Sequence, residues 1–486
     1  MARKVRAIII KNNKVLTIER RLPGMVYWVF PGGRVETNDK NDEEALKREC
    51  LEEINVEIKI LKMIWERNFK GQPEKFYVCE IVNGKPSRGK GPEYDRENKE
   101  YKGTHEIKWI KLQDIKNYYL KPEEIKDLLI KIYEKRSSAI SDFSNHNKKL
   151  NGVLPGFNKD IFYKISLKND CEKEIKGYFA IKKYLPAPRL LQTLEYKNIG
   201  IMFFEYEKSI GANRGLIADY LSMDETIFFK KYEKILSIWR KTFLKTLKKI
   251  RKSANSYFFR DRVKTRIEKY YDDDFWLKFE NQTINFNSSK LRLTPVKIIK
   301  DLKKFYRKNI TSWGVVSQGD PLSLNIGIKP IFFDFRVAGY NYLMSEFASV
   351  YWSNLALDDY FAMIYHPHSY INHEAALKGL NKVVFSGNTI FHVPNDIRIK
   401  TINNYTKEVI VPCLDEIKKR DTNYNWYLEF KNFIAMRIIA VLNLKEMNKT
   451  DQLLSLCYLQ LFFEINPRSP EDLNNLLFGY TKYKNA

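Results

Sequence analysis

Three glutamates within one short stretch are the residues of this chain best suited to chemistry. Glu49, Glu52 and Glu53 are spaced i, i+3 and i+4, so on a helix they would project from a single face. Like charges at this spacing repel one another, and a hard divalent cation relieves that repulsion. Mg²⁺ in proteins is held by a few carboxylates together with water and substrate phosphate oxygens. The stretch therefore predicts a site for a metal ion and a diphosphate.

The sequence around the glutamates predicts the elements that position them. The opposite face of the expected helix is apolar and can be buried; it carries Ala45, Leu46, Cys50, Leu51 and Ile54. Before the helix, Pro31, Gly32 and Gly33 predict a tight turn that brings the preceding strand up to it. Asn55 tolerates a left-handed backbone, which predicts that the helix ends there.

This arrangement resembles the signature box of the Nudix hydrolases, in which a glycine and a spacer precede Arg-Glu, an aliphatic residue, any residue and Glu-Glu. The corresponding residues are Gly33 and the run from Arg48 to Glu53, with the sequence RECLEE. The flanking segments KVRAIIIKNNKVLTIERR, YWVFPGG and HEIKWIKLQDI resemble the strands and the closing helix of that family. The resemblance covers residues 1 to about 135 and implies an α/β/α sandwich.

The resemblance also implies roles for individual residues. Glu49, Glu52 and Glu53 would hold Mg²⁺ or Mn²⁺, which polarises a bridging diphosphate and helps to activate the attacking water, with Glu53 as the catalytic carboxylate. Arg48 would orient the glutamates, and Gly32, Gly33 and Glu36 would support the box. The chain departs from the family in three places: Asp39 or Lys40 lies near the usual glutamate in a loop one residue longer, Cys50 fills the aliphatic position, and Asn55 replaces a glycine. The alternative interpretation is an amphipathic helix with a solvated acidic face.

Length and composition bound the rest of the chain. Its 486 residues exceed what one core usually supports, so two or three domains are expected. With 44% apolar residues, no long apolar run and no cleavable signal at the N-terminus, the composition predicts a cytoplasmic protein that does not enter a membrane. The five cysteines are scattered without a CxxC pair, which predicts reduced and mostly buried thiols.

A formal charge of +25 raises the question of a nucleic-acid partner. The excess of basic residues is spread over the chain, and it would also attract nucleotides. The concentrated run is 229–252, whose apolar residues recur at helical spacing. A solvated basic helix face is favoured there over a polyanion-binding surface.

A domain boundary is expected after the predicted helix KPEEIKDLLIKIYEKR, where residues 137–152 form a linker rich in serine and asparagine. Residues 1–136 would be the first domain. Beyond the linker, Asp320, Asn325 and Asp334 lie between and within two apolar runs. Carboxylates at strand ends with an intervening amide suit phosphoryl transfer, because one carboxylate can accept a hydroxyl proton while the others hold Mg²⁺ against ATP.

The order Asp, Asn, Asp is similar to that of the aminoglycoside phosphotransferase and choline kinase group, whose fold is bilobal and protein-kinase-like. The resemblance implies that Asp320 is the catalytic base, that Asn325 and Asp334 are metal ligands, and that ATP is the phosphate donor. Residues 153–209 would form the small lobe, and 210–486 the large, mainly helical lobe. The alternative interpretation of SQGDPLSLN is an ordinary turn.

The small lobe supplies the remaining candidates of this group. Lys164 on a strand and Glu174 on the next helix resemble the ion pair that binds nucleotide phosphates, with Glu172 in reserve. Glu205 and Tyr206 would form the hinge that meets adenine. Three departures concern the large lobe: Gln318 replaces a histidine, Pro321 follows the catalytic Asp320, and Glu346 replaces a buried aspartate.

Two further clusters are assigned to ordinary structure. His366, His368 and His373 are interrupted by Pro367 and are predicted to lie in a surface loop rather than a metal site. Asp272, Asp273 and Asp274 are predicted to cap a helix or contact a cationic substrate, and capping is favoured.

The expected protein is thus an α+β, multidomain, bifunctional enzyme that acts on nucleotide and small-molecule substrates. Nucleic acid is the less favoured partner. Two alternatives remain open: a nucleotide-sensing regulatory protein with one inactive half, and an enzyme that acts on RNA ends.

Overall fold

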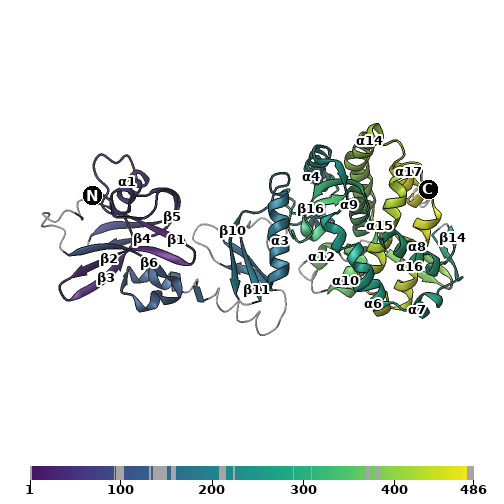
Figure 1. Cartoon of the computed structure of the whole chain (residues 1–486), viewed down its shortest axis with the longest axis horizontal. Coiled ribbons are helices and arrows are strands. Elements are labelled where there is room, and N and C mark those ends of the chain that lie inside the picture. The colour runs from purple at the N-terminus through teal and green to yellow at the C-terminus, as the bar shows by residue number, and fades with distance from the viewer. Residues whose placement is uncertain are drawn as a thin grey trace. The chain divides into compact units, whose positions relative to one another are not determined.

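The computed structural model places most of the chain in two compact units (Figure 1). It describes residues 3–69, 71–91, 94, 103–130, 133–134, 150–154, 160–196, 198–206, 215–222, 225–287, 289–307, 309–367, 373–377 and 382–478. The first unit comprises Met1–Ser166, Leu190–Leu194 and Ile201–Tyr206, and the second comprises Leu167–Arg189, Glu195–Gly200 and Glu207–Ala486. Most of the predicted linker, residues 137–149, lies outside the described residues.

A seven-stranded mixed sheet organises the N-terminal part. Its strands are β1 (Lys4–Lys11), β2 (Lys14–Leu22), β3 (Met25–Val29), β4 (Glu57–Phe69), β5 (Gln72–Asn83), β6 (Thr104–Lys111) and β7 (Leu120–Lys121). The order is β4-β5-β1-β2-β3-β7, and β6 pairs with β2. The β1–β5 and β3–β7 pairs are parallel and the remaining pairs are antiparallel.

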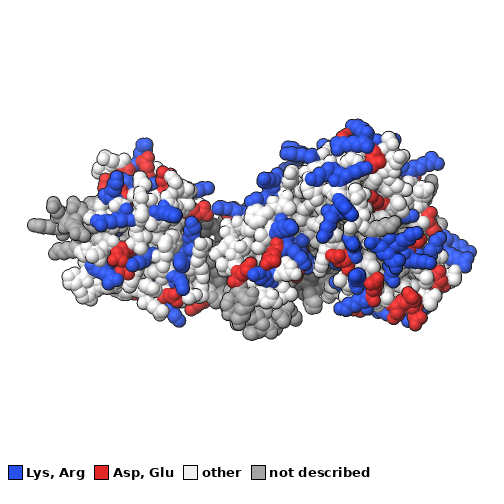
Figure 2. Space-filling model, viewed as in Figure 1, with Lys and Arg blue, Asp and Glu red and all other residues white. Residues whose placement is uncertain are grey.

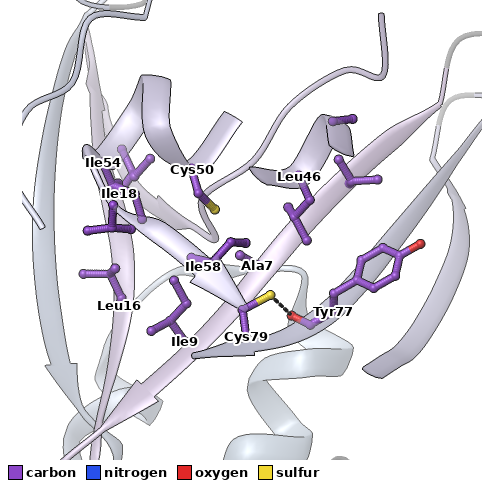
Figure 3. Packing of buried hydrophobic residues seen from close by; sticks show 13 residues of the cluster. Ala7, Ile9, Leu16, Ile18, Leu46, Cys50, Ile54, Ile58, Tyr77 and Cys79 are labelled. Carbon is purple, nitrogen blue, oxygen red and sulfur yellow. Dashed lines mark hydrogen bonds between the residues drawn. The ribbon is translucent and has the colours of Figure 1, made fainter. Parts of the chain in front are cut away.

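Helix α1 (Asp42–Ile54) packs against β1 and β4. Figure 3 shows its apolar side chains Leu46, Cys50 and Ile54 among residues of the sheet. The helix begins at Asn41, whose side chain accepts the Glu44 amide, and it ends at Asn55, whose φ of 53° is left-handed. The predicted helix end is therefore confirmed.

A second apolar cluster joins the sheet to the segment that follows it. Residues 123–130 are helical, and Ile125 and Leu129 contribute to this cluster with Phe30 and Phe76. All five cysteines of the chain are buried and none forms a disulfide bond, as predicted.

A separate four-stranded sheet follows, in the order β10-β11-β9-β8. Its strands are β8 (Leu150–Leu154), β9 (Ile161–Leu167), β10 (Leu190–Tyr196) and β11 (Ile199–Glu205). Helix α3 (Lys168–Ile181) connects β9 to β10 and packs against β16 (Gly339–Tyr342). A Cβ at Gly177 would lie 1.8 Å from the Phe335 carbonyl oxygen, so this glycine permits the close approach of α3.

The rest of the second unit is mainly helical. Its longer helices are α4 (Glu225–Thr246), α8 (Pro295–Arg307), α9 (Leu343–Trp352), α13 (Asp396–Tyr405), α14 (Val411–Arg420), α15 (Trp426–Ala440), α16 (Lys449–Glu464) and α17 (Pro470–Phe478). Two small sheets accompany these helices. The first consists of β12 (Lys248–Ile250), β15 (Ser312–Ser317) and β16. The second has the order β14 (Ser289–Arg292), β13 (Thr283–Phe286), β18 (Thr389–Val393) and β17 (Lys382–Ser386).

The basic run 229–252 is an amphipathic helix only as far as Thr246. Ile235, Trp239 and Phe243 are buried, and the lysines lie on the opposite face. Residues 248–250 then form a strand that pairs with β15, so the helical pattern does not extend through the whole run. In the described part of the chain, no helix is long and apolar enough to span a bilayer.

Candidate functional site

The glycine turn and α1 form one tightly packed corner of the N-terminal unit. Gly32 has a φ of 127°, and a Cβ there would lie 2.2 Å from the Val5 carbonyl oxygen, so only glycine fits. At Gly33 a Cβ would instead meet the Glu49 carboxylate, 2.4 Å from Oε2. The two glycines therefore serve different purposes: Gly32 allows the chain to pass β1, and Gly33 leaves room for a glutamate.

Glu53 is held by the backbone of the same turn. The Gly32 amide donates to Glu53 Oε2 over 2.6 Å, and Arg20 Nη2 lies 4.0 Å from Oε1. Only 4% of Glu53 is exposed. A carboxylate fixed by a backbone amide cannot swing freely, so the turn sets its orientation.

Glu49 is a buried carboxylate with incomplete compensation of its charge. Burial raises its pKa to about 7, although Arg48 acts in the opposite direction. The neighbouring carboxylate of Glu52 raises the pKa further, and Arg6 lowers it. A cation at this position would stabilise the ionised form, because opposite charge favours deprotonation of a desolvated carboxyl group.

Arg48 lies between these carboxylates and a loop aspartate. Its Nη1 donates to Glu49 over 3.2 Å and to Glu52 over 2.8 Å. Its Nε and Nη2 donate to the two oxygens of Asp39 over 3.1 and 3.0 Å, and this bidentate pair keeps the pKa of Asp39 below its usual range.

The sequence left two loop residues, Asp39 and Lys40, as candidates for the position of the usual glutamate. Asp39 is the one that reaches Arg48. Lys40 pairs with Glu44 instead. Glu36 lies 3.8 Å from Arg48.

The side chains of Glu49, Glu52 and Glu53 have the chemistry that a hard cation requires. All three side chains offer carboxylate oxygens, and Glu49 has a desolvated charge that a cation would compensate. Among the described residues, however, no group of three acidic, histidine or cysteine side chains already converges on one point. Arg48 occupies the position between Glu49 and Glu52, so metal binding requires these side chains to rearrange locally.

The second constellation lies in the loops after β15. The Gln318 side chain donates to the carbonyls of Phe333 and Asp334 over 2.6 and 2.8 Å and accepts the Asp320 amide over 2.8 Å. Asn325 Nδ2 donates to the Asp320 carbonyl over 2.9 Å. These bonds bring Asp320, Asn325 and Asp334 into one cluster. Gln318, which departs from the resembled family, is the residue that joins the two loops.

Asp320 also has an ion-pair partner that no sequence motif indicated. Arg437 Nη2 of α15 lies 2.9 Å from Asp320 Oδ1, and Arg437 is 2% exposed. Burial raises the pKa of Asp320, and Arg437 counteracts that shift. Glu346 is buried nearby; burial raises its pKa to about 8 and the Asp320 charge adds to that shift. Since 117 residues separate Arg437 from Asp320, no local motif could have revealed this pair.

The candidates predicted for a small lobe lie on strands and a helix of the four-stranded sheet region. Lys164 is on β9, and Glu205 and Tyr206 lie at the end of β11, where the Tyr206 amide donates to the Asp160 carbonyl over 2.8 Å. On α3, Glu174 is buried and Glu172 is exposed, which favours Glu174 over the reserve candidate. The ion pair of Lys164 with Glu174 stays a prediction.

The histidine and aspartate clusters have structural contacts. His373 Nδ1 lies 2.5 Å from Asp219 Oδ1. This histidine is therefore paired with a carboxylate, which the prediction of a surface loop did not include. His368 lies outside the described residues. Asp272 accepts the Phe275 amide over 2.9 Å and begins α7 (Asp273–Leu277), which confirms the predicted cap.

Comparison with known proteins identifies the N-terminal part. The NUDIX domain family matches residues 1–130. No match was found among curated proteins. Several solved structures are similar to part of the chain, and three of them are described here.

The Escherichia coli ORF135 protein is 22% identical, with 28% of this chain and 92% of that chain covered at a TM-score of 0.22. A NUDIX hydrolase from Nitrosomonas europaea is 19% identical, with 27% and 87% covered at a TM-score of 0.22. A NUDIX-family hydrolase from Clostridium perfringens is 19% identical, with 26% and 92% covered at a TM-score of 0.21. The assignment rests on the family match and on the sequence box rather than on these scores. This mixed α/β, multidomain chain therefore carries an N-terminal Nudix domain over residues 1–130.

Proposed function

We propose that the N-terminal domain is a metal-dependent hydrolase of nucleoside diphosphate-linked substrates. The observation that carries this proposal is the corner in which Gly32 fixes Glu53 and Gly33 makes room for Glu49. Glu49, Glu52 and Glu53 would hold Mg²⁺ or Mn²⁺, which lowers the pKa of bound water and polarises the diphosphate. Arg48, anchored by Asp39, would keep Glu49 and Glu52 in place when the metal leaves.

Glu53→Gln tests the hydrolase. The glutamine oxygen can still accept the Gly32 amide, so the fold is kept while the negative charge is lost. With Mg²⁺ and a panel of nucleoside triphosphates, dinucleoside polyphosphates and nucleoside diphosphate sugars, hydrolysis should fall by at least about 100-fold. Glu43→Gln, an exposed residue in the first turn of α1, is the matched control and should hydrolyse at the wild-type rate. A Glu53→Gln protein as fast as wild type would refute the proposal.

For residues 153–486 we propose a protein-kinase-like phosphotransferase that moves the ATP γ-phosphate to a hydroxyl of a small molecule. The supporting observation is the hydrogen-bonded cluster of Asp320, Asn325 and Asp334, joined through Gln318. Asp320 would accept the hydroxyl proton, and Asn325 and Asp334 would hold Mg²⁺ against the ATP phosphates. The Arg437 ion pair favours the ionised form of Asp320 that a base requires.

Asp320→Asn tests the second activity. Transfer of labelled γ-phosphate to a panel of hydroxyl compounds should be lost, whereas Asp415→Asn, an exposed residue of α14, should be neutral. Unchanged transfer in Asp320→Asn would show that the base assignment is wrong. Tight nucleotide binding without turnover in the wild-type protein would instead favour the regulatory alternative.

A further inference from the structure

One surface of the second unit concentrates positive charge. Helix α8 exposes Lys297, Lys300, Lys304 and Arg307 at intervals of three or four residues, which places them on one face. The preceding strand β14 adds exposed Lys290 and Arg292. We call these six residues the α8 basic face. Figure 2 shows basic side chains gathered where Figure 1 labels α8 and β14.

The charge of this face is scarcely neutralised. Within the described part of the chain, none of its six side chains forms an ion pair. Asp301 is the acidic residue on the exposed surface of α8 itself, and the nearby Glu280 caps the helix by accepting the Val296 amide over 3.1 Å. By contrast, on α4 Arg240 pairs with Glu408 and Glu225 pairs with Lys400.

A cavity continues the positive surface beyond the C-terminal end of α8. It is lined by Arg251, Lys252 and Arg260 together with Tyr306 of α8 and Asn309. Arg251, Lys252 and Arg260 are exposed, and among the described residues they form no ion pair. Arg260 donates to Asn309, which ties the cavity to the segment after α8.

The spacing of these cations suits a polymer of phosphates. From Lys297 to Arg307 the helix rises by roughly 15 Å, which is about the length of four base steps of a nucleic-acid strand. Like charges at i, i+3 and i+4 destabilise a helix, and a bound polyanion would relieve their repulsion. The described aromatic residues lining the cavity, such as Phe259, Tyr306 and Phe433, are buried, so the surface offers cations rather than exposed rings for stacking on bases.

We propose that the α8 basic face and its adjoining cavity bind the phosphate backbone of a nucleic acid without regard to sequence. Of the 229–252 run, for which a solvated basic helix face is favoured, only Arg251 and Lys252 belong to this surface. The contacts are electrostatic, so binding releases counterions and depends strongly on salt.

The test is fluorescence anisotropy with the full chain and labelled 20-mers of single-stranded RNA, single-stranded DNA and duplex DNA, between 50 and 300 mM salt. The variant Lys297→Gln/Lys300→Gln/Lys304→Gln keeps good helix formers on α8. For a single strand, each lost phosphate contact should reduce the slope of log K against log salt by about 0.7, so affinity at 0.1 M salt should fall roughly 100-fold. The three oligonucleotides show which nucleic acid is preferred.

The matched control removes three exposed lysines of α4, as Lys234→Gln/Lys241→Gln/Lys245→Gln. It carries the same change in net charge and should retain wild-type affinity. An equal loss in both triple variants would overturn the proposal, because net charge alone would then explain binding. Absence of binding at 50 mM salt, or binding to phosphatidylserine vesicles but not to oligonucleotides, would overturn it as well. Thermal unfolding of each variant checks that the fold is retained.

Discussion

Gly33→Ala should separate the folding role of the glycine turn from its role in the site. Gly33 has an ordinary φ, so alanine fits its backbone, in contrast to Gly32. The added Cβ would lie 2.4 Å from Glu49 Oε2, whereas ordinary van der Waals contact begins near 3.4 Å. The carboxylate must therefore move by about 1 Å.

The consequence of this movement can be estimated. A misplacement of about 1 Å near the reacting groups costs on the order of 100-fold in rate, which corresponds to roughly 2.7 kcal/mol of transition-state stabilisation. The carboxylate is the far end of a flexible side chain, so the fold can absorb the change. Replacing glycine with alanine also lowers the conformational entropy of the unfolded chain, which stabilises the folded protein by about 0.4–1 kcal/mol. This gain offsets part of any loss of folding stability caused by the added Cβ. The melting temperature should change by only a few degrees.

The assay combines Mn²⁺ binding by isothermal titration with hydrolysis of the nucleotide panel. Gly33→Ala should weaken Mn²⁺ binding and reduce hydrolysis. In a Glu49→Gln background, which removes the displaced charge, the same alanine should have little further effect, because the two changes act on one interaction. A Gly33→Ala protein with wild-type Mn²⁺ affinity and rate, or full additivity of the two changes, would refute the proposed position of Glu49 in the metal site.

Three further perturbations test other parts of the structure. Burial raises the pKa of Glu49 to about 7, so the ionised fraction of this side chain increases as the pH rises. The affinity for Mn²⁺ should therefore increase by about tenfold between pH 6 and 8. Glu49→Gln should remove this pH dependence. Asn55→Ala should destabilise the end of α1 by about 1 kcal/mol, because residue 55 has a left-handed φ that alanine tolerates poorly. Asn55→Gly should not destabilise it. Amide hydrogen exchange of the full chain measures the stability of this helix end in both variants. Arg437→Gln should raise the pKa of Asp320 further, so the acidic limb of the phosphotransfer pH profile should move to higher pH; an unmoved limb would contradict the ion pair's role.

Local sequence patterns were sufficient to predict much of the structure around the Nudix box. The spacing of Glu49 and Glu53, most of the apolar face of α1 and the asparagine at its end each involve neighbours within one or two turns, so short-range sterics and periodicity were sufficient to predict them. The exception is Leu51, which was predicted to be buried with that face but is 52% exposed. The end of α4 was less predictable. Lys248 and Ile250 continue the helical pattern in sequence, but their backbone pairs with β15, and strand pairing with a distant segment overrides local propensity.

The sequence by itself determined the Nudix box with its carboxylates, and it proposed Asp320, Asn325 and Asp334 as candidates, because both patterns consist of residue types at short spacings along the chain. Only the tertiary structure decided which neighbours control them. Arg437 reaches Asp320 from a helix far along the chain, and Gln318 joins two loops through backbone carbonyls. The physical reason is that burial, ion pairing and steric room depend on distances between remote segments, and no local pattern encodes those distances.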